Sequence, residues 1–180
     1  MLTRADALLL LVDFQVRLLP SIHGAEGLLE RTARLIRGAH LLGLPILVTE
    51  QYPLGVGPTD EKLIKVLGEA YRPIVKATMS CMGEPLFRQA LQACGRRQVI
   101  LCGIEAHVCV YQTAVDLLAV DYEVHLAADC VSSRREHDLE IALRRMAQSG
   151  CTVSTHEMAI FEMLQVSGTP EFKEWIRIVR

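Results

Sequence analysis

The sequence predicts a three-layer α/β fold with a mainly parallel sheet of six strands. One sign is the alternation of short apolar runs with longer segments whose apolar residues recur at helical spacing. A second sign is the run over residues 7–13, which is apolar until it reaches an acid, as expected for a parallel strand buried on both faces. Because right-handed crossovers join parallel strands, helices should cover both faces of the sheet.

The individual elements follow from the same periodicities. Strands are expected over residues 7–13, 45–49, 73–76, 98–103, 123–128 and 151–154. Helices are expected over residues 25–42, in a short stretch after Thr59, and over 84–93, 106–120, 135–149, 157–166 and 170–177. No repeat, linker or low-complexity segment divides the chain, so one domain over residues 1–180 is predicted.

Composition excludes several classes of function. The chain has 180 residues, 51% of them hydrophobic, which is enough for one globular domain with a large core. The formal net charge is −2 without a basic block, which argues against a charge-driven nucleic-acid or membrane-surface partner. No apolar run approaches the ~20 residues of a membrane span. The N-terminus is interpreted as mature structure, and a cytoplasmic location is expected.

The six cysteines, at positions 81, 94, 102, 109, 130 and 151, show neither a CxxC pair nor a zinc-ligand spacing. Most are expected to be small buried side chains in reducing surroundings. Cys109 differs from the others because of the segment that precedes it.

Three apolar runs lead to reactive side chains. Asp13 ends the first run, Lys76 ends the third, and Cys109 follows the fourth after a short loop. The carboxyl ends of parallel strands meet at one edge of the sheet, so we expect these side chains to lie together as a cysteine-hydrolase site. Cys109 should fall in the first turn of a helix, where the helix dipole and Lys76 would lower its pKa.

Each member of this set has a role and a structural alternative. Asp13 could take the thiol proton and return it to a leaving amine, and backbone N–H groups at the helix start could hold an oxyanion. Taken alone, a cysteine at such a position is more often a packed hydrophobic residue than a nucleophile, and a lysine after a short strand is usually a solvated surface residue. Asp13 is the strongest signal, because a charge directly after a long apolar run is uncommon.

Other residues near strand ends are weaker candidates. Phe14, Gln15, Gln51 and Tyr52 are candidates for a substrate pocket, with turn packing as an equal alternative. For His107, surface or packing roles are favoured over a base for Cys109, since residues two apart on a helix face different sides. For Asp129, helix capping or an ion pair is favoured over a second catalytic acid.

These motifs resemble the isochorismatase-like cysteine hydrolase superfamily. The resemblance rests on Leu-Leu-Val-Asp13-Phe-Gln15, on Lys76 and on Gly103-Ile-Glu-Ala-His-Val-Cys109-Val, and it runs from about residue 5 to about residue 166. The segments Val48–Pro53, Ala128–Arg134 and Thr155–Glu157 are most similar to the branch of isochorismatase domain-containing proteins.

The resemblance implies an isochorismatase-like fold and an Asp13–Lys76–Cys109 triad. Cys109 would form a covalent intermediate, Asp13 would act as base and then acid, and Lys76 would hold both in their charged forms. A cis peptide at Ile104–Glu105 would direct the N–H of Glu105, with that of Cys109, toward the oxyanion. Self-association into a homo-oligomer is also implied.

Two departures from the superfamily pattern narrow the prediction. Nicotinamidases carry an Asp-x-His metal motif after the second strand, whereas this chain has Glu50-Gln51-Tyr52-Pro53 and no histidine until His107. No catalytic metal, no cofactor and no nicotinamide hydrolysis are therefore expected. True isochorismatases lack the cysteine found here at position 109, which argues against isochorismate as the substrate.

The leading hypothesis is a metal-independent cysteine hydrolase that cleaves an amide, ureide or similar C–N bond of a small molecule through a thioester-type intermediate. One alternative is a scaffold or interaction protein that keeps the fold without turnover. Another is a hydrolase of an ester or enol-ether bond.

Overall fold

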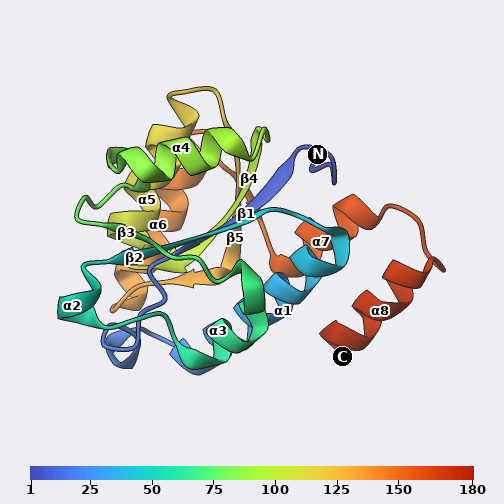
Figure 1. The fold of residues 1–180 in the computed structure, drawn as a ribbon, viewed down its shortest axis with the longest axis horizontal. Helices are drawn as coiled ribbons and strands as arrows, with labels where there is room; N and C mark the ends of the chain where they lie inside the picture. The colour runs from blue at the N-terminus through green and yellow to red at the C-terminus, as the bar shows by residue number, and fades with distance from the viewer.

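The computed structural model describes all residues, 1–180, and contains one six-stranded, all-parallel sheet (Figure 1). The strands are β1 (Ala7–Val12), β2 (Ile46–Gln51), β3 (Ile74–Lys76), β4 (Gln98–Ile104), β5 (Glu123–Ser132) and β6 (Thr152–Ser154). Their spatial order is β3-β2-β1-β4-β5-β6, so the chain runs outward from β1 in one direction and then in the other. The crevice at this reversal is where α/β folds place ligands.

Helices cover both faces of the sheet, which confirms the predicted three layers (Figure 1). They are α1 (Ala25–Leu42), α2 (Pro53–Val56), α3 (Glu61–Leu67), α4 (Pro85–Ala93), α5 (Tyr111–Leu118), α6 (Glu136–Gln148), α7 (His156–Leu164) and α8 (Pro170–Val179). Short 3₁₀ turns lie at Leu19–Ser21, Gly68–Ala70 and Cys81–Gly83. No helix combines the length and the apolar character that crossing a membrane requires.

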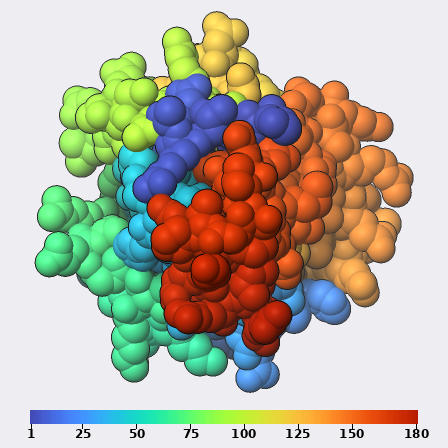
Figure 2. All heavy atoms as spheres, turned by 90° about the vertical axis from the view of Figure 1, so that its right-hand side faces the viewer, coloured from blue at the N-terminus to red at the C-terminus, as the bar shows by residue number.

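The sheet separates two hydrophobic clusters. Because successive side chains of a strand point to opposite faces, Leu9 and Leu11 pack on the side of α1, α3, α7 and α8. Leu8 and Leu10 pack on the side of α4, α5 and α6. Figure 2 shows the face of the molecule on which the C-terminal residues lie, in red, with the first residues of the chain, in dark blue, above them in this view. A hydrogen bond from the Leu2 N–H to Glu162 Oε2 (2.9 Å) joins the N-terminus to α7.

The structure departs from the predicted elements in three places. A turn-rich stretch contains the short helix α2. Strand β5 extends to Ser132, with a register irregularity where it pairs with β4 at Leu101–Gly103. The first part of the helix predicted at 106–120 is a π-helical turn, Ala106–Val110, which precedes α5. The last difference bears on the site, since this turn carries Cys109.

Candidate functional site

The predicted reactive side chains meet at the carboxyl edge of the sheet. Asp13 directly follows β1, Lys76 is the last residue of β3, and Cys109 lies in the π-helical turn after β4. All three are buried. Asp13 and Cys109 line one cavity of about 190 Å³, and its full lining is Asp13, Leu18, Gln51, Met79, Ile104, Glu105, Val108, Cys109 and Arg134.

Asp13 and Lys76 form a fully buried ion pair. Lys76 Nζ donates to Asp13 Oδ2 at 2.6 Å and to Gln51 Oε1 at 2.8 Å. The Thr49 hydroxyl donates to the other carboxylate oxygen, Asp13 Oδ1, at 2.8 Å. Burial is the strongest single influence and lowers the pKa of Lys76, but the Asp13 carboxylate, together with the neighbouring Cys109 and Cys81, outweighs burial and holds that pKa above its usual value. The lysine therefore remains an ammonium that fixes the carboxylate.

The pKa of Cys109 contradicts the sequence-based expectation. Burial raises this pKa most strongly and the Asp13 carboxylate adds to the rise, while Lys76 opposes both, so that the pKa reaches about 12. The predicted lowering is wrong because the strand-to-helix turn buries the sulfur and places it beside a carboxylate. The resting site therefore holds a protonated thiol next to an ionised acceptor.

The backbone before Cys109 also differs from the expectation. All peptide bonds are trans, so the cis bond expected at Ile104–Glu105 is wrong for this structure. Glu105 instead adopts the left-handed conformation (φ 54°, ψ 56°) and turns the chain from β4 into the π-helical turn. Gly103 allows β4 to lie close to β1, because a Cβ there would come within 2.7 Å of the Val12 carbonyl oxygen.

The four pocket candidates from the sequence lie in different places. Gln51 lines the cavity and accepts the hydrogen bond from Lys76. Phe14 is packed in the hydrophobic core, and Gln15 is buried with its amide donating to the carbonyl oxygens of Gln51 and Gly57. Tyr52 is exposed. The cavity beside Cys109 is thus lined by Gln51 and not by the other three residues.

Sequence reasoning missed several residues of the site. Thr49 is an ordinary strand residue by pattern, yet its hydroxyl holds Asp13 and also lies 3.8 Å from the Cys81 sulfur. Burial first, then Asp13, raises the pKa of Cys81 to about 11. Arg134 also lines the cavity, and it begins the charged run Arg134-Arg135-Glu136-His137 that is typical of a solvated helix start. The only signal for Thr49 was its spacing of two from Gln51, which puts both on one face of β2.

Glu50, near the end of β2, is held by hydrogen bonds from the segments that follow that strand. Glu50 Oε1 accepts hydrogen bonds of 2.8 Å from the Thr59 N–H, the Thr59 hydroxyl and the Tyr71 hydroxyl. Burial first, then Glu50, raises the pKa of Tyr71 to about 12. Glu50 therefore ties the loop after β2 to the body of the protein.

Three side chains of types that can bind a metal ion lie together elsewhere in the structure. Their potential ligand atoms are within 4.8 Å of one another, and the residues are Asp129, Cys130 and His156. Asp129 accepts from the His156 backbone N–H at 2.9 Å and from His156 Nδ1 at 2.5 Å. Burial raises the pKa of Asp129, but these hydrogen bonds outweigh it and lower the pKa below its usual value. The predicted capping or ion-pair role is confirmed, although the helix capped is α7 and not the next one along the chain.

His107 also has the packing role that was predicted for it. Its Nδ1 lies 3.0 Å from the Ser133 hydroxyl.

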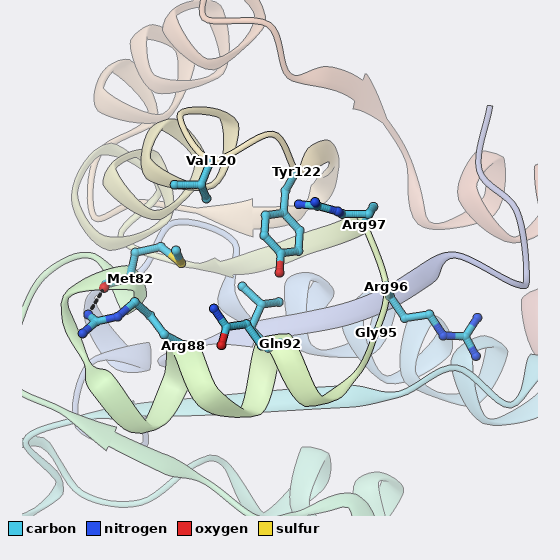
Figure 3. A pocket seen from close by; sticks show the side chains of 9 residues that line it. Met82, Arg88, Gln92, Gly95, Arg96, Arg97, Val120 and Tyr122 are labelled. Carbon is cyan, nitrogen blue, oxygen red and sulfur yellow. Dashed lines mark hydrogen bonds between the residues drawn. The ribbon is translucent and has the colours of Figure 1, made fainter.

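A separate groove of about 480 Å³ lies between α4 and the residues that lead into β4 and β5, at the opposite end of these strands from Cys109. Figure 3 shows Tyr122 and Gln92 in its middle and Arg88 donating to the Met82 carbonyl oxygen. The Arg97 guanidinium lies 5.4 Å from the centre of the Tyr122 ring. The groove contains none of the predicted catalytic residues.

Known proteins resemble this chain in both sequence and structure. The isochorismatase domain family matches residues 7–158. Isochorismatase domain-containing protein 2 of Danio rerio is 40% identical over 174 residues, which are 96% of this chain and 86% of that protein. The structure named MAR1 ribonuclease, from Caenorhabditis elegans, is 36% identical with a TM-score of 0.92 and covers 99% of this chain and 91% of that one.

The YcaC gene product of Escherichia coli, described as an octameric hydrolase of unknown specificity, has the same fold. It is 24% identical with a TM-score of 0.89 over 99% of this chain and 86% of that one. The family supports a hydrolase function. A family match over most of the chain, with relatives 36% and 40% identical over nearly all of it, shows that the chain belongs to the isochorismatase domain family.

Proposed function

We propose that the protein is a metal-independent cysteine hydrolase that cleaves the C–N bond of a small amide or ureide with Asp13, Lys76 and Cys109. The observation that carries the proposal is the buried Asp13–Lys76 pair beside the cavity that Cys109 also lines. Breaking a buried ion pair is strongly unfavourable, so such a pair holds a carboxylate ionised and in place. An ionised carboxylate next to a protonated thiol is the arrangement that general-base activation needs.

In the first half-reaction, the Cys109 sulfur attacks the carbonyl carbon while its proton passes to Asp13. The carbonyl electron pair moves to oxygen and forms a tetrahedral intermediate. Its collapse breaks the C–N bond, and Asp13 returns the proton to the leaving nitrogen. The products of this half-reaction are an amine and a thioester on Cys109.

In the second half-reaction, water attacks the thioester carbon and gives a proton to Asp13. Collapse of the new intermediate releases the acid, and Asp13 returns the proton to the Cys109 sulfur. Lys76 stays charged throughout and keeps Asp13 ionised between the steps. The N–H groups of Glu105 and Cys109 are proposed to stabilise the oxyanion in both halves.

The cavity favours a small substrate. Its volume of about 190 Å³ is below the range of about 300–1,000 Å³ that is usual for drug-sized ligands. Four lining side chains are apolar: Leu18, Met79, Ile104 and Val108. One arginine lines it, and this arginine is paired with a glutamate. Although the relative from Caenorhabditis elegans is named a ribonuclease, these features support a small molecule over a nucleic acid, whose recognition relies on unpaired cations along the phosphates.

The predicted homo-oligomer has support in the surface around the site. Tyr52, Leu54, Val75 and Met79 are exposed apolar side chains on or beside the short edge strand β3. Edge strands and contiguous apolar patches are typical of interaction sites. Light scattering after size-exclusion chromatography should therefore give a mass above the 20.0 kDa of one chain.

A substrate panel tests the proposed chemistry. Small amides, ureides, esters and enol ethers would be incubated with the wild type, Cys109→Ala and Asp13→Asn, and intact-mass spectrometry would detect an acyl adduct. We expect turnover of a C–N substrate that falls at least about 10³-fold in both variants. Cys94→Ala is the matched control, because Cys94 is a partly buried thiol that does not line the cavity.

Each other outcome of the panel points to a different function. Turnover only of esters or enol ethers would replace the C–N bond in the proposal. Absence of both turnover and an adduct across the panel would favour the scaffold alternative. Cleavage of RNA that depends on Cys109 would overturn the small-molecule substrate.

A further inference from the structure

Two charged side chains other than Asp13 line the cavity, and they are bound to each other. Arg134 Nε lies 2.7 Å from Glu105 Oε1. Glu105 directly follows β4 and precedes the turn that carries Cys109, whereas Arg134 follows β5. The Glu105 side chain is 15% exposed and that of Arg134 is 59% exposed, so the carboxylate lies deeper than the guanidinium.

The surroundings of Glu105 leave Arg134 as its main partner. Its second oxygen, Oε2, is buried and makes no hydrogen bond. His107 Nδ1 lies 3.4 Å from Oε2 but is closer, at 3.0 Å, to the Ser133 hydroxyl. A buried carboxylate is costly unless a cation balances it, and Arg134 supplies that balance.

The charges that border the cavity therefore cancel in pairs. Asp13 is balanced by Lys76 and Glu105 by Arg134. The Gln51 amide is also engaged, since its oxygen accepts from Lys76 and its nitrogen donates to the Ala77 carbonyl oxygen. No unpaired charge remains on the lining to attract an ionic ligand.

We propose that Glu105 determines substrate specificity by neutralising Arg134, so that the site takes uncharged amides and rejects their carboxylate-bearing analogues. This inference rests on the proposed function and names the substrate class for the same site. Without Glu105, the Arg134 guanidinium would be free to attract an anion in a small apolar cavity, where charge interactions are stronger than in water. With Glu105 present, a ligand carboxylate would meet two carboxylates, Asp13 and Glu105, whose countercharges are already engaged.

A pair of alkylating reagents measures this selectivity without knowledge of the substrate. Iodoacetamide is uncharged and iodoacetate is an anion of nearly the same size, and each would be reacted with Cys109 at one pH. Peptide mass spectrometry gives the two rates, each divided by the rate with free cysteine in solution. We expect the ratio of iodoacetate to iodoacetamide to rise about tenfold in Glu105→Gln, because the substitution removes one negative charge and releases Arg134.

Two further variants and a control complete the experiment. Arg134→Gln should lower the ratio below that of the wild type, because Glu105 then stands without its countercharge. This change in the ratio has the opposite sign to that expected for Glu105→Gln, so it tests the proposal even if Glu105→Gln fails to fold. The control is Glu136→Gln, which removes a negative charge from an exposed residue that does not line the cavity and should leave the ratio unchanged.

The outcomes separate this inference from the proposed function. Ratios within twofold of the wild type in both Glu105→Gln and Arg134→Gln would overturn the inference, and they would leave the triad untouched if the substrate panel shows turnover. A panel without turnover would overturn the proposed function while the charge selectivity of the cavity could still be measured. A Cys109 that neither reagent modifies in any variant would overturn both, because the cavity would then not admit a ligand.

Discussion

The molecule contains two clusters that each combine an aspartate, a basic residue and a cysteine, and only one of these clusters borders a cavity. Asp13 and Lys76 lie beside Cys109, which is 7% exposed and lines the site. Asp129 and His156 lie beside Cys130, which is fully buried in the core. The His156 ring also packs edge-on against Trp175, with ring centres 6.3 Å apart.

The comparison shows that residue types alone do not make a catalytic site. An aspartate, a histidine and a cysteine are a more familiar hydrolytic combination than an aspartate, a lysine and a cysteine. Yet both carboxylate oxygens of Asp129 accept hydrogen bonds from His156, one from its backbone N–H and one from its ring, at the start of α7. The thiol of Cys130 is fully buried and is inaccessible to a substrate. Access of the thiol to a cavity distinguishes the two clusters, and four substitutions or measurements test that difference.

The largest effect is expected from Lys76→Met, which breaks the pair in the site. The variant leaves the buried Asp13 carboxylate without its countercharge, and removing one partner of a buried pair destabilises a protein by about 3–5 kcal/mol. Urea unfolding would measure the loss, and hydrolysis should disappear with it. Lys173→Met is the control, since it removes a lysine from α8, far along the chain from the site. A loss below about 1 kcal/mol would mean that the pair is as weak as a surface pair.

Asp129→Asn should lower stability without lowering activity. It weakens two hydrogen bonds to His156, and a hydrogen bond to a charged group contributes about 1.5–3 kcal/mol. Because the folded-state pKa of Asp129 lies below its usual 3.8, its charge stabilises the fold above that pH. The difference between wild type and variant should therefore shrink as the pH falls through the folded-state pKa. If kcat/KM fell by more than the fraction of folded protein, Asp129 would contribute to catalysis and the comparison would fail.

Thr49→Val sharpens the comparison at the site itself. The substitution keeps the side-chain shape but removes the hydrogen bond to Asp13 Oδ1, which leaves a buried oxygen with one donor fewer. A stability loss of about 1–3 kcal/mol is expected, together with a lower kcat, because Asp13 is held less firmly. Thr32→Val serves as control, since the Thr32 hydroxyl is buried and makes no hydrogen bond. Equal effects of the two substitutions would remove Thr49 from the site.

The smallest effect concerns the titration of Cys109. With a pKa of about 12, its alkylation rate should keep rising to about pH 10, whereas an ordinary thiol with a pKa of about 8.5 levels off. Asp13→Asn should move the profile to lower pH, since the Asp13 carboxylate raises the pKa of Cys109. Mass spectrometry of the Cys109 peptide would record both profiles. A plateau near pH 8.5 in the wild type would show an unburied thiol and contradict the structure.

Most of the fold could be predicted because apolar periodicity and strand-ending residues are local features. The meeting of Asp13 and Lys76 was predictable for a topological reason: parallel strands bring their carboxyl ends to one edge whatever the loops do. Directions of side chains just beyond a strand were not predictable. The Phe14 side chain packs in the core and the Tyr52 side chain is exposed to solvent, although both residues lie just beyond the end of a strand.

The electrostatic properties of the site were harder to predict from the sequence than the fold. A helix start predicts a lowered thiol pKa only if the sulfur remains solvated, and the burial of Cys109 is a property of the assembled turn. The left-handed backbone at Asp13 and Glu105 is similarly unmarked, since neither position holds the glycine that usually signals it. Arg134 was hidden because pairing with Glu105 needs two strands to be placed side by side first.

The short edge strand gives the ion pair a second consequence. β3 has three residues and pairs only with β2, yet its last residue reaches past β2 to Asp13 at the end of β1. The Lys76–Asp13 ion pair thus links the edge strand of the sheet to its central strand β1. Strand margins open more readily than cores, so partial opening of this edge would disconnect the lysine while the rest of the sheet stayed intact. The protein would then lose its chemistry well before it lost its fold.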